Sequence, residues 1–224
     1  MTKGKIAEIF DSIQGEGLYF GEKQLFVRLF GCNLDCLFCD TRLRRFMEYD
    51  AEELVKELQL YRDQYHSVSF TGGEPLMQKK FLKEALRLSR AQGYRTYLET
   101  NGTLPEALEE VIDDVDIIAM DIKLPSSSGH RDYWHVNYRF LEVASKKETF
   151  VKIVVCDSTT FEDFKISLQL IRDVDIGVVL VLQPNSYELS EALTQKLEHF
   201  RLVAEQEGVT VCVIPQIHRI MGMR

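Results

Sequence analysis

Apolar runs alternate with amphipathic stretches along most of the chain. Six short runs rich in β-branched and aromatic residues predict strands, at residues 24–30, 67–70, 94–99, 116–122, 150–155 and 177–183. Between strands, residues 51–64 and 79–93 place apolar side chains three and four positions apart, which predicts amphipathic helices. A seventh apolar run, at residues 209–214, predicts an added strand at an edge of the sheet.

This alternation predicts the fold class. Strands that are apolar on both faces and joined by helices are typical of an α/β fold with a parallel sheet covered by its crossover helices. Six strand–helix units indicate an open or partial (β/α)6 barrel, with the seventh run as an additional C-terminal strand. No linker, fixed-period repeat or low-complexity tract interrupts residues 1–224, so we expect a single domain.

Composition narrows the class of protein. The five cysteines are an odd number, and the first residues contain no apolar run of signal-peptide or membrane-span length. We therefore expect a cytoplasmic protein that is not associated with a membrane. The net charge of −8 disfavours direct nucleic-acid binding, which needs clustered Lys and Arg, and favours a small-molecule partner.

The distinctive peptides follow the predicted strands. In order along the chain they are GCNLDCLFCDT, TGGEP, TNG, KLP and QPN, after the first, second, third, fourth and sixth strands. The loops at the carboxyl ends of parallel strands carry the chemistry in such folds. The sequence therefore predicts one site at this edge of the sheet.

Three cysteines share the first of these loops in a C-x3-C-x2-C spacing: Cys32, Cys36 and Cys39. A closed zinc site takes four ligands, and an electron-carrying 4Fe-4S cluster normally takes four cysteines. A cluster held by three leaves one iron open to an exogenous ligand. Zinc completed by a distant residue such as His66 or Cys212 is the alternative on spacing alone, whereas simple packing fits poorly with so polar a loop.

The loop, with Phe38 just before its last cysteine, resembles the signature of the radical S-adenosylmethionine (SAM) superfamily, and TGGEP resembles that family's glycine-glycine-glutamate motif. The resemblance implies a partial barrel of the radical SAM type. It also implies a 4Fe-4S cluster whose open iron chelates SAM, so that an electron splits SAM into a 5′-deoxyadenosyl radical.

The peptides SIQGEG, ETNGT, DIKLPSSSG and PQIHRIMGMR extend the likeness to one family within it, 7-carboxy-7-deazaguanine synthase. Its members convert 6-carboxy-5,6,7,8-tetrahydropterin to 7-carboxy-7-deazaguanine with loss of ammonia, on the route to queuosine-type bases. The resemblance thus implies a lyase. It also implies a homodimer and an electron donor such as flavodoxin or ferredoxin.

The resemblance assigns residues to both ligands. The substrate set is Gln14, Gly15, Glu16, Arg28, Thr71, His218 and Arg224, the last two as part of a tail that closes over the site. The SAM set is Phe38, Asp40, Gly73, Glu74, Glu99, Lys123 and Gln183. Thr41 matches a position that binds Mg²⁺ together with the substrate, which suits a hard cation.

Several of these residues have plainer interpretations. SIQGEG could be a glycine turn, Arg28 a member of a surface ion pair, the Asp40–Thr41 pair a helix cap and the tail a frayed terminus. The remaining cysteines and histidines carry no motif, and we expect Cys156 and Cys212 to be buried packing residues.

Two other functions share part of the pattern. A glycyl-radical activating enzyme uses the same cysteine loop but acts on a protein, and a non-catalytic zinc module would need no SAM. SIQGEG, the Asp40–Thr41 pair and PQIHR favour the synthase, because an enzyme that docks a protein has no need of them.

Overall fold

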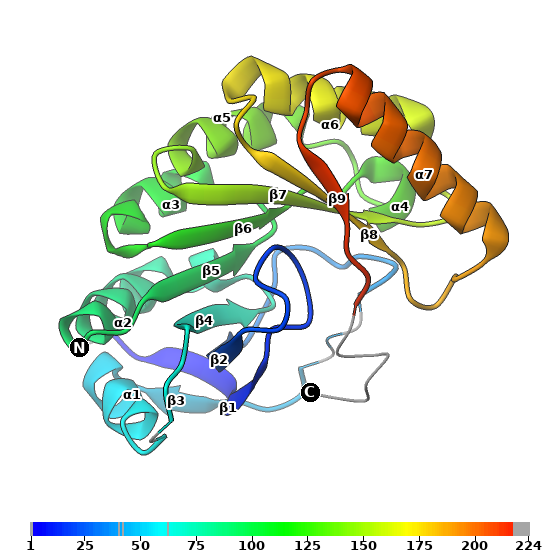
Figure 1. Cartoon of the computed structure of the whole chain (residues 1–224). Coiled ribbons are helices and arrows are strands. Elements are labelled where there is room, and N and C mark those ends of the chain that lie inside the picture. The colour runs from blue at the N-terminus through cyan, green and yellow to red at the C-terminus, as the bar shows by residue number, and fades with distance from the viewer. Residues whose placement is uncertain (1, 40, 42, 62, 217–224) are drawn as a thin grey trace.

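A computed structural model describes residues 2–39, 41, 43–61 and 63–216. Within these residues the strands form one nine-stranded sheet in the order β3-β1-β2-β4-β5-β6-β7-β8-β9. The strands are β1 (Gly4–Ile13), β2 (Lys23–Leu29), β3 (Met47–Tyr49), β4 (Ser67–Gly72), β5 (Thr96–Thr100), β6 (Ile117–Asp121), β7 (Glu148–Val155), β8 (Val179–Pro184) and β9 (Val211–Val213). The sheet curves into an open partial barrel with helices on its outer face (Figure 1).

The predicted α/β class and parallel barrel are confirmed. Strands β2, β4, β5, β6, β7 and β8 are successive parallel neighbours, and they correspond to the six predicted strands. The added C-terminal strand is also present, because β9 pairs parallel with β8 at one edge of the sheet. The barrel remains open between β3 and β9.

Two strands were not predicted. Strand β1 runs antiparallel to β2 and β3, and its register shifts between Ile6 and Glu8. This irregularity interrupts the alternation of apolar and polar side chains that identifies a half-buried strand. Strand β3 is only three residues long, too short for a periodic pattern.

The helices cross over the outer face of the sheet. They are α1 (Ala51–Leu58), α2 (Lys79–Ala91), α3 (Pro105–Val111), α4 (Pro125–Ser128), α5 (Trp134–Ala144), α6 (Phe161–Val174) and α7 (Glu191–Gln206), with the 3-10 turns η1 (Pro75–Gln78) and η2 (Ile112–Asp114). Helix α1 begins at a capping box made by Asp50 and Glu53. The helix ends at Leu58, whereas the predicted helix ran to residue 64. Beyond the end of the helix, the Tyr61 hydroxyl donates a hydrogen bond to the Ile9 carbonyl at 3.2 Å.

The two faces of the sheet are packed differently. A large core of aliphatic and aromatic side chains fills the space between the outer face and the helices. On the concave face a second, small cluster forms an apolar floor: Tyr97, Ile117, Ala119, Phe150 and Val181. Above this floor, nearer the carboxyl ends of the strands, the inward positions become polar, as Glu99, Asp121 and Lys152 show.

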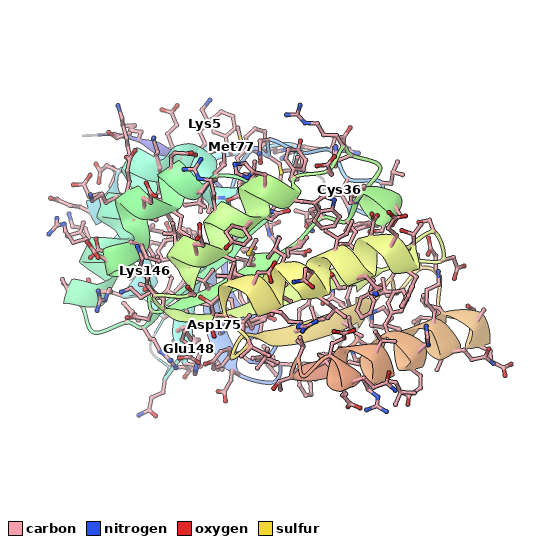
Figure 2. All side chains as sticks on the ribbon, turned by 90° about the horizontal axis from the view of Figure 1, so that it is seen from above. Lys5, Cys36, Met77, Lys146, Glu148 and Asp175 are labelled. Carbon is pink, nitrogen blue, oxygen red and sulfur yellow. The ribbon has the colours of Figure 1, made fainter. Side chains whose placement is uncertain are left out.

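The carboxyl ends of the parallel strands therefore form one rim of the barrel. Figure 2 shows Cys36 near this rim, far from Glu148, which begins β7, and from Asp175, which follows α6. Within the described ranges, no helix combines the length and the apolar character needed to cross a membrane.

Candidate active site

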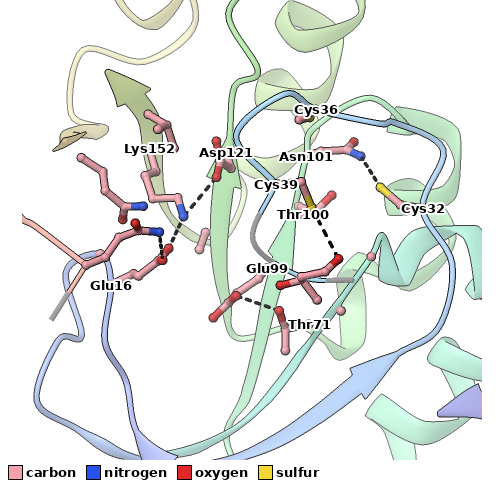
Figure 3. Close-up of a pocket in the computed structure, with 18 of the residues that line it drawn as sticks. Glu16, Cys32, Cys36, Cys39, Thr71, Glu99, Thr100, Asn101, Asp121 and Lys152 are labelled. Carbon is pink, nitrogen blue, oxygen red and sulfur yellow. Dashed lines mark hydrogen bonds and ion pairs between the residues drawn. The ribbon is translucent and has the colours of Figure 1, made fainter. Parts of the chain in front are cut away.

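A cavity of about 960 Å³ occupies the concave face of the barrel. Most of the predicted site residues line it: Gln14, Gly15, Glu16, Arg28, Cys32, Cys36, Phe38, Cys39, Thr41, Thr71, Gly73, Glu99, Lys123 and Gln183. Residues from both ends of the chain thus meet in one place (Figure 3). Of the other predicted residues, Asp40, His218 and Arg224 lie outside the described residues.

The cysteine loop forms one wall of this cavity. Cys32, Cys36 and Cys39 all line it, and none of them is in a disulfide. The Leu34 N–H donates to the Cys32 sulfur at 3.4 Å, and the Asn101 amide lies 4.0 Å from the same sulfur. Burial raises the pKa of the Cys32 thiol and raises that of Cys36 to about 11. Binding of a metal centre must therefore displace protons from these thiols.

Neighbouring segments hold the cysteine loop in place. The Leu37 N–H donates to the Ser128 carbonyl at 3.0 Å, and the Asp35 N–H donates to His130 Nε2 at 3.1 Å. Gly129, between these two partners, has a φ of +78°, and a Cβ there would lie 2.8 Å from the Leu37 side chain. The SSSG segment and His130 have no predicted role, but both support the loop.

An amide network fixes the other side of the loop. The Asn101 side chain donates to Asn33 Oδ1 at 2.9 Å, and Asn33 donates to the Thr103 hydroxyl at 2.8 Å. Asn101 and Thr103 follow β5, so the loop after β2 is tied to the end of a strand two places away in the sheet.

The TGGEP segment packs directly against the loop. The Gly73 N–H donates to the Leu29 carbonyl at 3.1 Å, and the Glu74 N–H donates to the Gly31 carbonyl at 2.8 Å. A Cβ at Gly73 would lie 2.0 Å from the Gly31 oxygen. The absence of a side chain at Gly73 is therefore required for close approach of the two backbones.

Glu74 differs from its predicted place, because it does not line the cavity. Its carboxylate is completely buried and accepts from the Leu76 N–H at 3.0 Å, the Thr100 hydroxyl at 2.9 Å and the Asn101 N–H at 2.7 Å. Burial raises its pKa to about 7, against the opposing effect of these donors. Its side chain caps η1 and joins TGGEP to the end of β5.

Opposite the cysteines, neutral polar side chains surround Glu99. One oxygen of Glu99 accepts from the Gln14 amide at 2.9 Å, and the other accepts from the Thr71 hydroxyl at 2.8 Å. The side-chain oxygen of Gln14, Oε1, in turn accepts from the Glu16 N–H at 3.1 Å. The SIQGEG turn is therefore anchored through Gln14 to the inner face of the barrel.

Charged side chains form the rest of this wall. Lys152 pairs with Glu16 and lies 3.0 Å from Asp121 (Figure 3). Lys123 lies 2.8 Å from the same carboxylate of Asp121. Burial alone lowers the pKa of each lysine, but the neighbouring carboxylates outweigh it and raise both values above the ordinary one. Both lysines are therefore cationic at neutral pH.

Several polar groups in the cavity remain available to a ligand. Gln183 is 1% exposed, and neither of its amide atoms has a hydrogen-bond partner among the described residues. The buried Asp121 Oδ1 is likewise unpartnered there. Arg28 contacts Glu8 at 3.4 Å, an ion pair on the partly exposed side of the wall. Buried groups of this kind are normally satisfied, so their position indicates a polar ligand.

Sequence reasoning missed four residues that contact predicted ones: Asn101, Asp121, Lys152 and Gln216. A signal existed for Lys152, which is a lone charge in the apolar run FVKIVV at an inward-facing position. Gln216 lay within the PQIHR peptide but was given no role. Its amide donates to Glu16 Oε1 at 2.8 Å.

The alternative zinc site is not supported. His66 precedes β4, whereas the cysteine loop lies beyond the opposite end of that strand, which runs about 20 Å. Cys212 lies on the edge strand β9, half-buried against the apolar floor, and Cys156 is buried as expected. In the part of the chain that the structure covers, no three His, Cys, Asp or Glu side chains converge as ligands of one metal ion. A 4Fe-4S cluster is larger than one ion and takes more widely spaced thiolates.

The donor set fits a 4Fe-4S cluster and SAM. Three unpaired thiols line one cavity, and they are the soft ligands that iron–sulfur clusters take. Unpartnered Asp121 and Gln183 atoms face the same space and could contact SAM.

Comparison with known proteins agrees with this site. The family model of the radical SAM superfamily matches residues 27–186. A 7-carboxy-7-deazaguanine synthase of Geobacter sulfurreducens is 37% identical over 250 residues, covering 97% of each chain. Another, of Methanothermobacter thermautotrophicus, is 33% identical over 250 residues, covering 100% of this chain and 99% of the relative.

A solved structure extends the comparison to the fold. The crystal structure of QueE from Escherichia coli superimposes with a TM-score of 0.67 at 19% identity, covering 94% of this chain and 93% of that one. This likeness shows a shared fold, and the sequence matches show the family. The chain belongs to the radical SAM superfamily and, within it, to the family of the 7-carboxy-7-deazaguanine synthases.

Proposed function

We propose that this protein is a radical SAM carbon–nitrogen lyase that converts 6-carboxy-5,6,7,8-tetrahydropterin to 7-carboxy-7-deazaguanine with release of ammonia, in queuosine-type 7-deazaguanine biosynthesis. One observation carries the proposal: a single cavity is lined by the cysteine loop and also by Gln14, Glu16 and Arg28. The relatives that match from end to end bear the name of this activity.

The cysteine wall holds the cofactors in this proposal. Cys32, Cys36 and Cys39 bind a 4Fe-4S cluster, which with bound SAM supplies the 5′-deoxyadenosyl radical. The Gly73 backbone, Asp121, Lys123 and Gln183 are assigned to SAM, since all of them line the cavity at the carboxyl ends of β4, β6 and β8. The protein's own contribution is to position SAM beside the substrate and to exclude water.

The opposite wall recognises the pterin. An amide and a carboxylate, from Gln14 and Glu16, match the donor and acceptor pattern of an aminopyrimidinone ring. The Arg28 guanidinium can bind the 6-carboxylate through two parallel hydrogen bonds. These would replace the ion pair that Arg28 makes with Glu8. Thr71 and Glu99 extend the polar surface along β4 and β5.

The remaining assignments follow from the family. We assign Mg²⁺ to Thr41, which lines the cavity two residues beyond Cys39 in the sequence, and a tail contact to His218 and Arg224. Asp40 would support the same loop. We also assign a single-domain homodimer in the cytoplasm that receives its electron from a flavodoxin or ferredoxin.

An anaerobic assay tests the function. The reconstituted protein is incubated with SAM, a reductant and 6-carboxytetrahydropterin, and the product and ammonia are quantified. We expect both to form with SAM cleavage. SAM cleavage that yields no deazaguanine but installs a radical on a glycyl-radical protein would identify an activating enzyme instead, and a colourless protein containing zinc would identify the non-catalytic module.

A further inference from the structure

Lys152 is the central charged residue on the wall of the cavity opposite the cysteines. It lies on the inner face of β7, directly opposite Asp121 in the β6–β7 register, and its side chain is 13% exposed. Its ammonium group bridges two carboxylates, Glu16 from the SIQGEG turn and Asp121 from β6, and lies between them in Figure 3. No motif includes this lysine.

The bridge joins the two halves of the site. Glu16 belongs to the predicted pterin set, and Asp121 is paired with Lys123 from the predicted SAM set. Without the ammonium group, two carboxylates would face each other across the gap that it fills. In a partly buried site such like charges repel strongly, so Glu16 would turn away or take up a proton.

Two other contacts of Glu16 differ in kind from this bridge. Gln216 donates to Glu16 Oε1, but a neutral amide does not balance the charge of the carboxylate. The Glu16 N–H is held by Gln14, which fixes the backbone of the turn and not the carboxylate. Lys152 therefore supplies the Glu16 carboxylate with a balancing charge that neither of these two contacts provides.

We propose that Lys152 is a positioning residue, which orients the ionised Glu16 carboxylate toward the pterin and links it to the Asp121–Lys123 pair beside SAM. The inference rests on the proposed function, because it assigns Glu16 to the substrate. Lys152 acts through Glu16 and need not touch the pterin.

The test compares substrate binding and coupling in matched variants. Lys152→Met keeps the length of the side chain and removes its charge, Lys152→Arg keeps the charge, and Lys79→Met removes a similar ion pair, with Glu110, outside the cavity. Dissociation constants for the pterin and for SAM are measured anaerobically on the cluster-loaded protein without reductant. The ratio of 5′-deoxyadenosine to deazaguanine is then measured with reductant.

We expect Lys152→Met to weaken pterin binding by about 10- to 100-fold, the usual cost of losing a charged hydrogen bond. SAM binding should change far less, because Lys123 still pairs with Asp121. The ratio of 5′-deoxyadenosine to product should rise. Lys152→Arg should recover part of the affinity, and Lys79→Met should match the wild type in all three measurements.

A double variant separates positioning from direct contact. If Lys152 acts through Glu16, Glu16→Gln/Lys152→Met should bind the pterin no worse than Glu16→Gln alone. Full additivity would overturn the positioning role, as would wild-type affinity in Lys152→Met. Should Lys152→Met fail to fold or to bind iron, Lys152→Gln provides the same comparison. A wild-type protein that neither binds nor converts the pterin would instead overturn the proposed function.

Discussion

The two walls of the cavity are built in opposite ways. The cysteine wall is one continuous loop, held by backbone and side-chain hydrogen bonds that it donates to Thr103, Ser128 and His130. The charged wall brings together segments from distant parts of the chain: the SIQGEG turn, β6, β7 and the residue Gln216. The first depends on the conformation of a loop, and the second depends on strand register.

The difference has a physical basis. A metal cluster needs several sulfurs within a short distance, which a short loop provides with little loss of chain entropy. A flat polar substrate needs donors and acceptors around its whole edge, which only several strand ends can provide. Lys152 and Asp121 meet because β6 and β7 pair in the register that places them opposite each other.

The largest effect should come from the cysteine wall. Replacing Cys32, Cys36 or Cys39 with Ala should abolish SAM cleavage, because each is a ligand in the proposed cluster. Cys156→Ala and Cys212→Ala are the matched controls, since neither belongs to the loop, and both should retain iron. Iron content and 5′-deoxyadenosine formation measure the outcome. Loss of iron in Cys212→Ala together with full activity in a loop variant would contradict the assignment.

A second prediction concerns how tightly that wall is packed. In Gly73→Ala the new methyl group would lie 2.0 Å from the Gly31 oxygen, so the cysteine loop must move. We expect a loss of about 1 to 3 kcal/mol in the free energy of unfolding, and a more labile cluster. Gly177→Ala is the control, because the nearest atom there, at 3.1 Å, is an Asp175 carboxylate oxygen that can shift. Denaturant unfolding and the rate of iron release are measured for both variants. Equal stability and equal iron release in the two would contradict the close packing of Gly73 against the cysteine loop.

The same contrast explains which parts could be predicted from the sequence. The parallel strands and the cysteine loop are local patterns, and each is read within a dozen residues. Strand β1 was missed because its register shift disrupts the alternation of apolar and polar residues. The role of Lys152 was missed because one partner, Glu16, is 136 residues away in the sequence and the other, Asp121, lies on another strand. The local sequence marks Lys152 as a lone charge in an apolar run, but it does not identify the partners that strand pairing brings to it.

The family resemblance supplied what local patterns could not. It placed Gln14 and Glu99 at the site, and the structure shows them hydrogen-bonded to each other at 2.9 Å. It did not indicate that the Glu74 carboxylate would be buried against Leu76, Thr100 and Asn101, since the motif specifies a residue type and not its contacts.

The third prediction tests the junction between the walls. Thr41 lines the cavity next to Cys39, whose sulfur lies 3.5 Å from the Thr41 carbonyl oxygen. Thr41→Val nearly preserves shape and removes the hydroxyl that we assign to Mg²⁺. The rate of product formation should fall about 10-fold or more, as is usual when a metal-site residue is lost, and its response to added Mg²⁺ should weaken. Thr41→Ser is the control that retains the hydroxyl. An unchanged rate and an unchanged Mg²⁺ response in Thr41→Val would show that Thr41 does not bind Mg²⁺.

The smallest expected effect concerns the buried carboxylates near the two walls of the cavity. In the charged wall, the carboxylates of Glu16 and Asp121 are paired with lysine side chains. Glu74, under the cysteine wall, accepts its direct hydrogen bonds from N–H and O–H groups of neutral residues. Burial raises the pKa of Glu74 from 4.5 to about 7. Between these values the unfolded chain has released its proton and the folded protein keeps it, so stability is greatest below pH 4.5 and falls as the pH rises through 7.

Glu74→Gln isolates this contribution, because glutamine has nearly the same shape and does not titrate. Between pH 5 and pH 7 the wild type should lose about 2 kcal/mol of unfolding free energy relative to Glu74→Gln, from the difference between its folded and unfolded pKa. Denaturant unfolding of both proteins at the two pH values gives this difference, in which the titration of every other carboxylate largely cancels. A wild type that instead gains stability over the variant with rising pH would mean that Glu74 is already ionised at pH 5. The three donors around it would then outweigh its burial, and the two walls would differ in the partners of their carboxylates but not in their charge.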